Sequence, residues 1–280
     1  VALGQIQDQY VGITAANNAT TKNTTALTMS ASNAYATVAR VKTDLRKLNV
    51  PLAGCAVFVS PEMENYLVQA SEFNSSDKGV DIRVNGLVGR ISGLPVYVSN
   101  NLPHVRVLTA ATIATANDTM TINGVVFTFV ANGTATNAGE ISIGANAAAM
   151  QANIILAING SGTPGASTYR EVSAANRLLL KNAMVTAASA WVSDTLRIYM
   201  NQSLTITETF TPAGDVFAAD AVVMIAMDAD AVNVADQMTQ MASRDQVDAF
   251  TTNLLGEYVY GAAVLGRNAD RISTYDVANG

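Results

Sequence analysis

The chain offers few side chains that could carry out catalysis or bind a metal. Among its 280 residues there is one histidine, His104, and one cysteine, Cys55. A Ser-His-Asp or Cys-His enzyme would have to be built around His104, and the sequence contains no Gly-x-Ser-x-Gly elbow. One cysteine and one histidine also exclude a typical zinc site. We therefore expect His104 to be a packed or surface residue, Cys55 to be a small buried residue, and the protein not to be an enzyme.

The acidic residues do not follow the pattern of a known cation site. Carboxylates gather in one stretch, at Asp215, Asp220, Asp228, Asp230 and Asp236. Their spacing differs from that of an EF-hand loop, and the glycine that such a loop requires is absent. The glycines between 86 and 93 likewise lack the Lys-Ser/Thr ending of a phosphate-binding loop. We expect a solvated acidic rim here, with no metal and no cofactor.

Composition narrows the class of protein further. Hydrophobic residues make up 49% of the chain and charged residues only 14%, well below the ~25% of an average protein. A net charge of −6 argues against a nucleic-acid reader, which would carry a basic patch. The longest apolar runs, such as 221–227, fall short of the ~20 residues of a membrane helix. We see no signal peptide, and a chain that begins with Val1 is expected to be processed or incomplete.

The first hundred residues predict helices and short strands after a polar start. Residues 1–28 are rich in Thr and Asn and predict an arm or loop that does not fold by itself. From Ser30 to Leu48, apolar residues recur at steps of three and four, which predicts an amphipathic helix capped by Ser30. Residues 56–59 predict a buried strand. Ser60 and Pro61 then predict the start of a second helix, followed by a polar loop over 71–85.

A glycine-punctuated stretch follows, from Gly86 to Pro103. It predicts a strand opening at Ile91, a break at Gly93, and a second strand that includes Val96 and Val98.

The segment 109–209 changes character and predicts a small, self-contained α+β module. Asn123 and Gly124 between two alternating runs predict a hairpin with a type I′ turn. Residues 145–158 predict a helix closed by Gly160. Residues 172–180 predict a second hairpin, and further strands follow near residues 196–206.

The last segment returns to the earlier character. Residues 221–227 predict a buried strand and 230–238 a short helix. The alternating run around 258–263 is expected to pair with 271–275. The core would then be discontinuous, with 29–108 and 210–280 folding together around the inserted domain 109–209.

Two stretches carry a resemblance to a known family. The first, residues 86–103, reads G-x-x-G-x-I-x-G-x-P-V-Y-x-S-N-x-L-P, and the second, residues 258–272, reads Y-V-Y-G-A-A-V-L-G-R-N-A-D-R-I. Together with the helix at 30–48 they resemble major capsid proteins of tailed bacteriophages, of the Hong Kong 97 type. The inserted segment resembles a small module that recurs in phage structural proteins.

The resemblance implies an α+β capsid fold, with a peripheral domain holding the long spine helix and an axial domain, interrupted by a β-rich insertion. It implies a shell of hexamers and pentamers that encloses double-stranded DNA without sequence-specific binding, assembles in the bacterial cytoplasm and contacts decoration or portal proteins. No membrane is involved. The polar face of the helix and the basic residues of the two stretches become candidate subunit contacts, namely Arg40, Lys42, Asp44, Arg90, Arg267 and Arg271.

Two other functions stay open at this point. The same fold could form an encapsulin-type compartment loaded with an enzyme, although the large insertion argues against it. A secreted adhesin or carbohydrate-binding module would suit the neutral Thr/Asn surface, but Trp191 is the only tryptophan available for stacking on a sugar.

Overall fold

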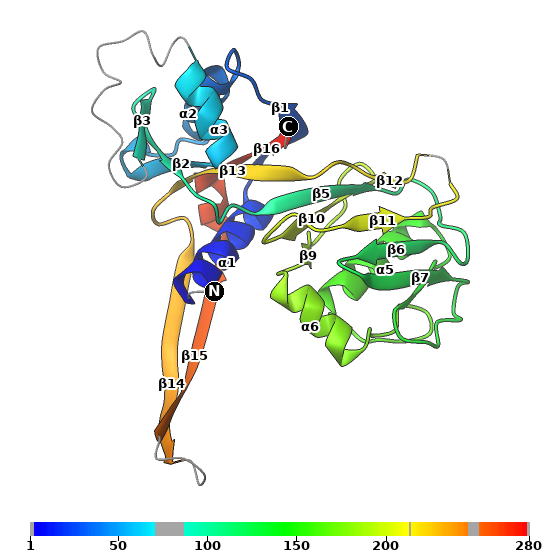
Figure 1. Ribbon diagram of the computed structural model, residues 1–280. Helices are drawn as coiled ribbons and strands as arrows, with labels where there is room; N and C mark the ends of the chain where they lie inside the picture. Colours follow the sequence, from blue (N-terminus) through cyan, green and yellow to red (C-terminus); the bar gives the residue numbers. More distant parts are fainter. Residues whose placement is uncertain (1–2, 71–86, 213, 246–251, 279–280) are drawn as a thin grey trace.

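The structure, a computed structural model, describes residues 3–70, 87–212, 214–245 and 252–278. It is a mixed α+β protein. A ten-stranded sheet lies at its centre. Seven of its strands follow the order β3-β4-β2-β13-β5-β10-β9, and β1, β12 and β16 pair off this path. The sheet divides at β13 (Ala221–Asp228), whose second half pairs with β2 (Cys55–Val59) and whose first residues pair with β5 (His104–Thr109). Two lobes and a projecting hairpin result (Figure 1).

The first lobe is built on β2, β3 (Leu87–Ile91) and β4 (Leu94–Val98). Helices α2 (Ala34–Lys47) and α3 (Pro61–Gln69) cover one face of this part of the sheet (Figure 1). A short turn, η1 (Leu52–Gly54), leads into β2. The helix periodicity is confirmed, because the buried face of α2 packs in one cluster with Met224 of β13. The predicted cap of α3 is also confirmed, since Ser60 Oγ accepts a hydrogen bond from the Met63 amide at 3.2 Å.

Two details of this lobe differ from the prediction. Helix α2 begins at Ala34 rather than at Ser30, because Asn33 Oδ1 accepts a hydrogen bond from the Ser30 amide and holds residues 30–33 in a turn. At 1.5 Å per residue α2 is therefore ~21 Å long. Ile91 ends its strand instead of opening it, and Ser92 (φ 52°) and Gly93 (φ 89°) make a tight turn into β4. The predicted loop over 71–85 lies outside the described residues.

The prediction of an arm over residues 1–28 is wrong for the described part. Residues 3–18 form α1 (Leu3–Asn18), and β1 (Thr21–Thr28) pairs in parallel with β16 (Ile272–Ala278). Helix α1 packs on its own chain mainly through small residues, since Ala15 and Ala16 are fully buried. Alanine has the highest helix propensity and lets the helix approach the sheet closely, so few large apolar side chains are needed.

The second lobe contains a four-stranded sheet of order β11-β6-β7-β8. The predicted hairpin is confirmed, because Asn123 (φ 51°) and Gly124 (φ 77°) form the turn between β6 and β7. The helix over 145–158 is confirmed as α5, which ends at Gly160 in the left-handed conformation. The elements are β6 (Thr119–Ile122), β7 (Val125–Val130), β8 (Glu140–Ser142), α5 (Ala147–Asn159) and β11 (Ile206–Glu208).

The hairpin predicted at 172–180 is wrong. Ser173 Oγ accepts a hydrogen bond from the Asn176 amide at 3.2 Å and caps helix α6 (Ala174–Asn182). The predicted turn residues are thus the first turn of a helix.

The second lobe is not separate from the central sheet. Strands β9 (Thr186–Ala187) and β10 (Thr195–Met200) belong to the ten-stranded sheet, and β10 pairs with β5 over its whole length. Strand β12 (Val216–Phe217) pairs with β5 as well. One cluster of buried hydrophobic residues runs from α1 through β5 into β7 and α5. The structure therefore differs from the self-contained module predicted over 109–209.

The C-terminal part differs most from the prediction. Of the residues predicted as a short helix at 230–238, 230–232 lie in a turn and 233–238 begin β14 (Asn233–Asp245). Strand β14 pairs with β15 (Thr252–Ala263) in a sheet of two strands. After the short helix η2 (Gly266–Arg271), β16 pairs with β13 and β1 and not with the 258–263 run. Strand β16 is buried along nearly its whole length, and this burial overrides pairing with its neighbour in sequence.

Candidate assembly surface

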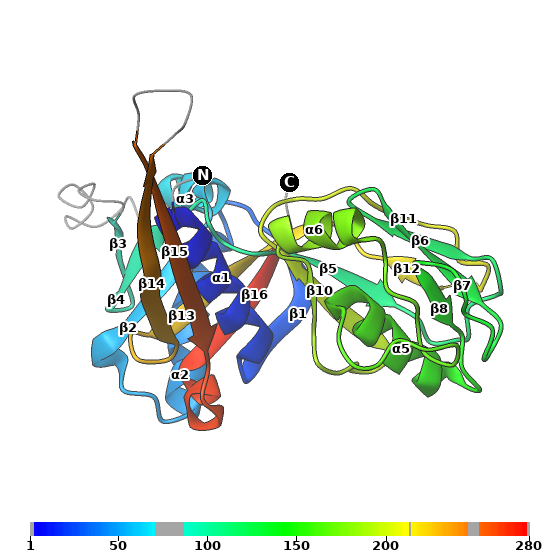
Figure 2. The same ribbon diagram turned by 90° about the horizontal axis from the view of Figure 1, so that it is seen from below.

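The β14–β15 hairpin projects away from both lobes (Figures 1 and 2). Its ladder runs from the Asn233–Ala263 pair to the Asp245–Thr252 pair, with an irregularity between Met238 and Gln240. At ~3.3 Å per residue, β14 is ~43 Å long. No third strand pairs with either edge among the described residues. The hairpin therefore offers two open backbone edges to another chain.

The base of the hairpin is fixed against α1. Tyr10 of α1 packs edge-to-face on Tyr260 of β15, with ring centroids 5.7 Å apart. Val234 and Val259 at the base remain 51% and 50% exposed. The hairpin thus leaves the body at a set position while apolar side chains at its root still face solvent.

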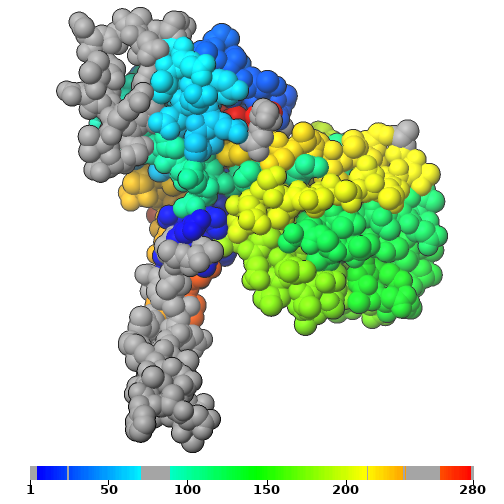
Figure 3. Space-filling model, viewed as in Figure 1, coloured from blue at the N-terminus to red at the C-terminus, as the bar shows by residue number. Residues whose placement is uncertain are grey.

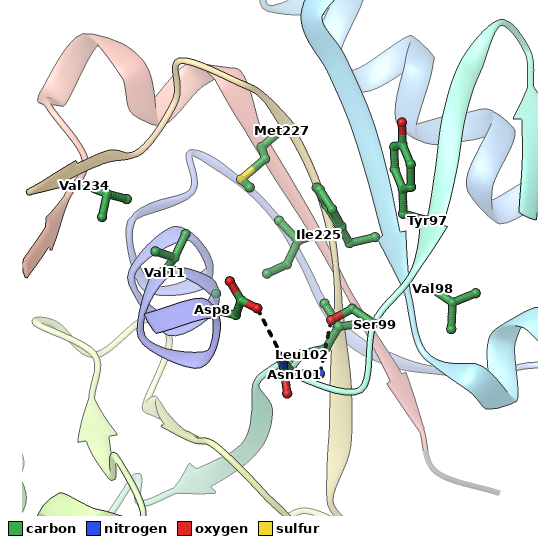
Figure 4. Close-up of a pocket in the computed structure, with 12 residues that line it drawn as sticks. Asp8, Val11, Tyr97, Val98, Ser99, Asn101, Leu102, Ile225, Met227 and Val234 are labelled. Atoms are coloured by element: carbon green, nitrogen blue, oxygen red, sulfur yellow. Dashed lines mark hydrogen bonds between the residues drawn. The ribbon is translucent and has the colours of Figure 1, made fainter. Parts of the chain in front are cut away.

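A largely apolar pocket lies beside this base, between α1, the end of β4, β13 and the start of β14 (Figure 4). Its volume is about 530 Å³. At its polar end, Asn101 donates two hydrogen bonds. Its side-chain Nδ2 donates to Asp8 Oδ2 at 3.4 Å, and its backbone N–H donates to Ser99 Oγ at 3.1 Å. Its apolar lining includes Val11, Phe58, Val98, Leu102, Ile225 and Met227.

A polar pocket of about 590 Å³ also adjoins the hairpin base, beside η2. It brings together two of the sequence-predicted residues, Arg267 and Arg271, with Asp230 and Asn233. The Arg271 guanidinium donates to Asp228 Oδ2 at 3.0 Å. Arg267 is exposed and forms no ion pair within the described part of the chain. Arg267 is therefore a charged group available to a second molecule.

The other predicted residues fall into two groups. Lys42 donates to the Ser92 carbonyl at 2.6 Å, and Asp44 accepts the Tyr275 hydroxyl. These two hold α2 to the strands of its own chain. Arg40 on α2 and Arg90 on β3 are exposed.

The residues that could act as catalytic groups or metal ligands lie in different parts of the structure. His104 Nδ1 lies 2.8 Å from Asp220 Oδ2 on the second lobe's side of the sheet. Cys55 is buried, and burial, followed by the nearby Asp228 carboxylate, raises the pKa of its thiol. Asp215, one of the carboxylates expected in the acidic rim, accepts hydrogen bonds from the Ala111 backbone amide and the Thr112 hydroxyl. No group of three or more metal-ligating residues occurs among the described residues.

Comparisons with known proteins give one weak similarity. No family model and no curated protein matches the chain. A solved structure from Mycobacterium phage Che8 aligns with 98% of this chain and 58% of its own, at 13% identity and a TM-score of 0.45. This chain thus spans somewhat over half the length of that protein. Separately, no described helix has the length and apolar content to cross a bilayer.

The hairpin is the feature that the sequence pattern did not reveal. The alternation of Tyr258, Tyr260 and Ala262 indicated a strand, and that strand is β15. Its partner β14 carries polar residues at many positions, such as Gln237, Thr239 and Gln240, and so lacks the apolar alternation of a half-buried strand. A strand that no sheet covers need not show that alternation.

Proposed function

We propose that the chain is a structural shell subunit: the major capsid protein of a tailed phage, with a Hong Kong 97-type fold. Copies associate into hexamers and pentamers that build an icosahedral head around double-stranded DNA. The protein carries out no catalysis and needs no cofactor. It assembles in the bacterial cytoplasm and resides in the virion, where portal or decoration proteins are further partners.

The observation that carries this proposal is the projecting β14–β15 hairpin. A two-stranded ribbon is at best marginally stable in water, and three strands or a packed helix are needed to stabilise it. Beyond the Tyr10–Tyr260 contact at its base, no third strand pairs with it among the described residues. In the proposed shell, the hairpin of one copy lies on the body of its neighbour, which supplies the missing packing.

The surroundings of the hairpin base support repeated self-association. The apolar pocket and the Arg267 pocket both adjoin the point where the hairpin leaves the body. An apolar contact beside a charged rim is the usual anatomy of a protein interface. Arg267 has no ion pair within the described residues and can form one with a carboxylate of a neighbouring copy.

Composition supports the same function. Only 14% of residues are charged, so much of the surface is neutral and can be buried against copies of itself without desolvating many ions. The net charge of −6 is compatible with a shell that encloses DNA without binding it sequence-specifically. The two stretches at 86–103 and 258–272 supply the family resemblance.

The proposal is tested by negative-stain electron microscopy of the purified full chain over a range of salt and pH. We expect closed shells, or rings of five or six subunits. DNA packaged in shells formed in cells would identify a phage head, whereas a co-purifying enzyme inside them would indicate an encapsulin-type compartment instead. A monomer of 29.2 kDa under every condition would contradict the proposal. Glycan binding by that monomer would favour the adhesin function.

A further inference from the structure

A second cavity, away from the hairpin, lies where the N-terminal segment meets the second lobe. Its volume is about 430 Å³. One wall is the junction between α1 and β1, with Asn17, Thr20 and Lys22, and the other is the segment 188–197. Its small apolar lining consists of Ala19, Ala188, Ala190 and Val192.

The cavity carries an excess of positive charge. Lys22 and Arg197 both line it. The carboxylate beside them is Asp276, and both of its oxygens are taken by the Arg197 guanidinium, at 2.5 and 2.6 Å. The Arg197–Asp276 pair is therefore neutral as a unit, and the positive charge of Lys22 is not neutralised by it.

The Lys22 ammonium is also short of hydrogen-bond acceptors. An ammonium group has three donors. Among the described residues Lys22 Nζ has one acceptor, the Asn17 carbonyl at 2.5 Å. Burial lowers the pKa of Lys22 to about 8; Arg197 lowers it too, and Asp276 acts in the opposite direction. The cavity thus disfavours the charged lysine as it stands, and a bound negative charge would reverse that effect.

Hydroxyl groups complete the lining. Thr20, Ser189 and Thr195 lie around the same cavity. Thr195 already donates its hydroxyl to the Val192 carbonyl at 2.6 Å, which leaves the hydroxyls of Thr20 and Ser189 as additional donors. Carboxylates and phosphates accept hydrogen bonds from hydroxyl and ammonium groups, and this cavity is lined by both kinds of donor.

We propose that this cavity binds a small oxyanion, a carboxylate or a phosphate, between Lys22 and the segment 188–197. The bound anion accepts hydrogen bonds from Lys22 Nζ and from the neighbouring hydroxyls. It joins β1 to the loop before β10 and so clamps the second lobe to the N-terminal segment. The site is independent of shell formation.

The test is calorimetric titration of the full chain with sodium acetate and, separately, with inorganic phosphate, in a chloride buffer free of oxyanions. We expect saturable binding of at least one anion at pH 7. Lys22→Gln should weaken it by about 10- to 100-fold, the range for losing a hydrogen bond to a charged group. The matched control is Lys47→Gln, since the Lys47 side chain is 70% exposed, and it should leave binding unchanged.

Acetate also gives a test that needs no variant. Acetate stays ionised and arginine stays protonated between pH 7 and 9. Lys22 is the group facing the cavity that loses its charge in this interval, so acetate affinity should fall as the pH rises past about 8. Absence of saturable binding of both anions, or equal binding by Lys22→Gln and the native chain, would overturn the proposal. Acetate affinity independent of pH over this interval would also overturn it.

Discussion

Arg197 and Asp276, which are 79 residues apart in sequence, form a buried bidentate ion pair. Arg197 lies on β10, within the segment predicted as an insertion, and Asp276 lies on β16, the last strand. Arg197 Nε also donates to the Tyr199 hydroxyl at 2.9 Å, and that hydroxyl donates to the Ala16 carbonyl of α1 at 3.1 Å. One polar network therefore joins the N-terminal helix, the inserted segment and the C-terminal strand.

Breaking this ion pair should destabilise the whole protein. In Asp276→Ala the Arg197 guanidinium stays buried without its partner, which we expect to lower the free energy of unfolding by about 3–5 kcal/mol. Chemical denaturation monitored by circular dichroism measures the loss. The double variant Arg197→Met/Asp276→Leu removes both charges and should recover much of it. A cost for Asp276→Ala within ~0.5 kcal/mol, the range of an ordinary surface substitution, would show that the pair is not buried.

The same network bears on how the inserted segment folds. A fragment of residues 109–209 lacks all of β5 except Thr109, so the edge of β10 that pairs with β5 would be exposed. We expect this fragment to unfold without cooperativity. A fragment of residues 104–218 retains β5 and β12 and should unfold in a single transition. Thermal melts of the two fragments compare them directly, and a sharp transition in the shorter one would mean that the segment is an independent domain.

Leu45 tests the packing of α2 on the sheet. Its side chain is fully buried among residues of α2, β2 and β13, so Leu45→Ala should cost about 2–5 kcal/mol by removing apolar contacts and leaving a cavity. The neighbouring Arg46 is exposed, and Arg46→Ala should change stability by less than ~0.5 kcal/mol. Equal effects of the two substitutions in a urea titration would contradict the assigned face of the helix.

Lys22 should give stability a recognisable pH dependence. Burial lowers the pKa of Lys22 in the folded protein from 10.5 to about 8. Between these values the unfolded chain holds more protons than the folded chain, so this residue makes stability rise with pH. In a buffer without oxyanions, the difference in unfolding free energy between the native chain and Lys22→Gln should therefore shift in favour of the native chain from pH 8 to 10. A difference that stays constant over this interval would contradict the lowered pKa.

Local signals in the sequence predicted the local structure well. Asn123-Gly124, Ser60-Pro61 and Gly160 each determine a turn or a helix end through their own backbone preferences, and all three were correctly placed. The errors arose where distant contacts decide the outcome. Helix α1 is held by the burial of alanines and not by a stripe of large residues. Helix α6 contains a Leu-Leu-Leu run that is typical of a buried strand, but Leu178 and Leu179 are 57% and 47% exposed.

The candidate assembly surface was predictable only in part. Arg267 and Arg271 lie within one resembling stretch, and the structure places both in one pocket. Arg40 and Asp44 lie four residues apart and share a face of α2, whereas Lys42 lies on another face. The partners of Lys42 and Asp44, Ser92 and Tyr275, come from distant parts of the chain. The hairpin itself was missed because β14 is polar, and an uncovered strand shows no apolar alternation.

The most direct test of the proposed assembly is light scattering of a variant with a shortened hairpin. Residues 237–259 are replaced by Asn-Gly, which favours a two-residue turn and joins Asp236 to its ladder partner Tyr260. The Tyr10–Tyr260 contact at the base is retained. Leu178→Ser, an exposed position on the second lobe, serves as the control.

We expect the native chain and the control to form particles of shell or ring mass, and the shortened variant to remain a folded monomer that melts in a single cooperative transition. Assembly of the shortened variant to the same mass as the native chain would contradict the central role of the hairpin.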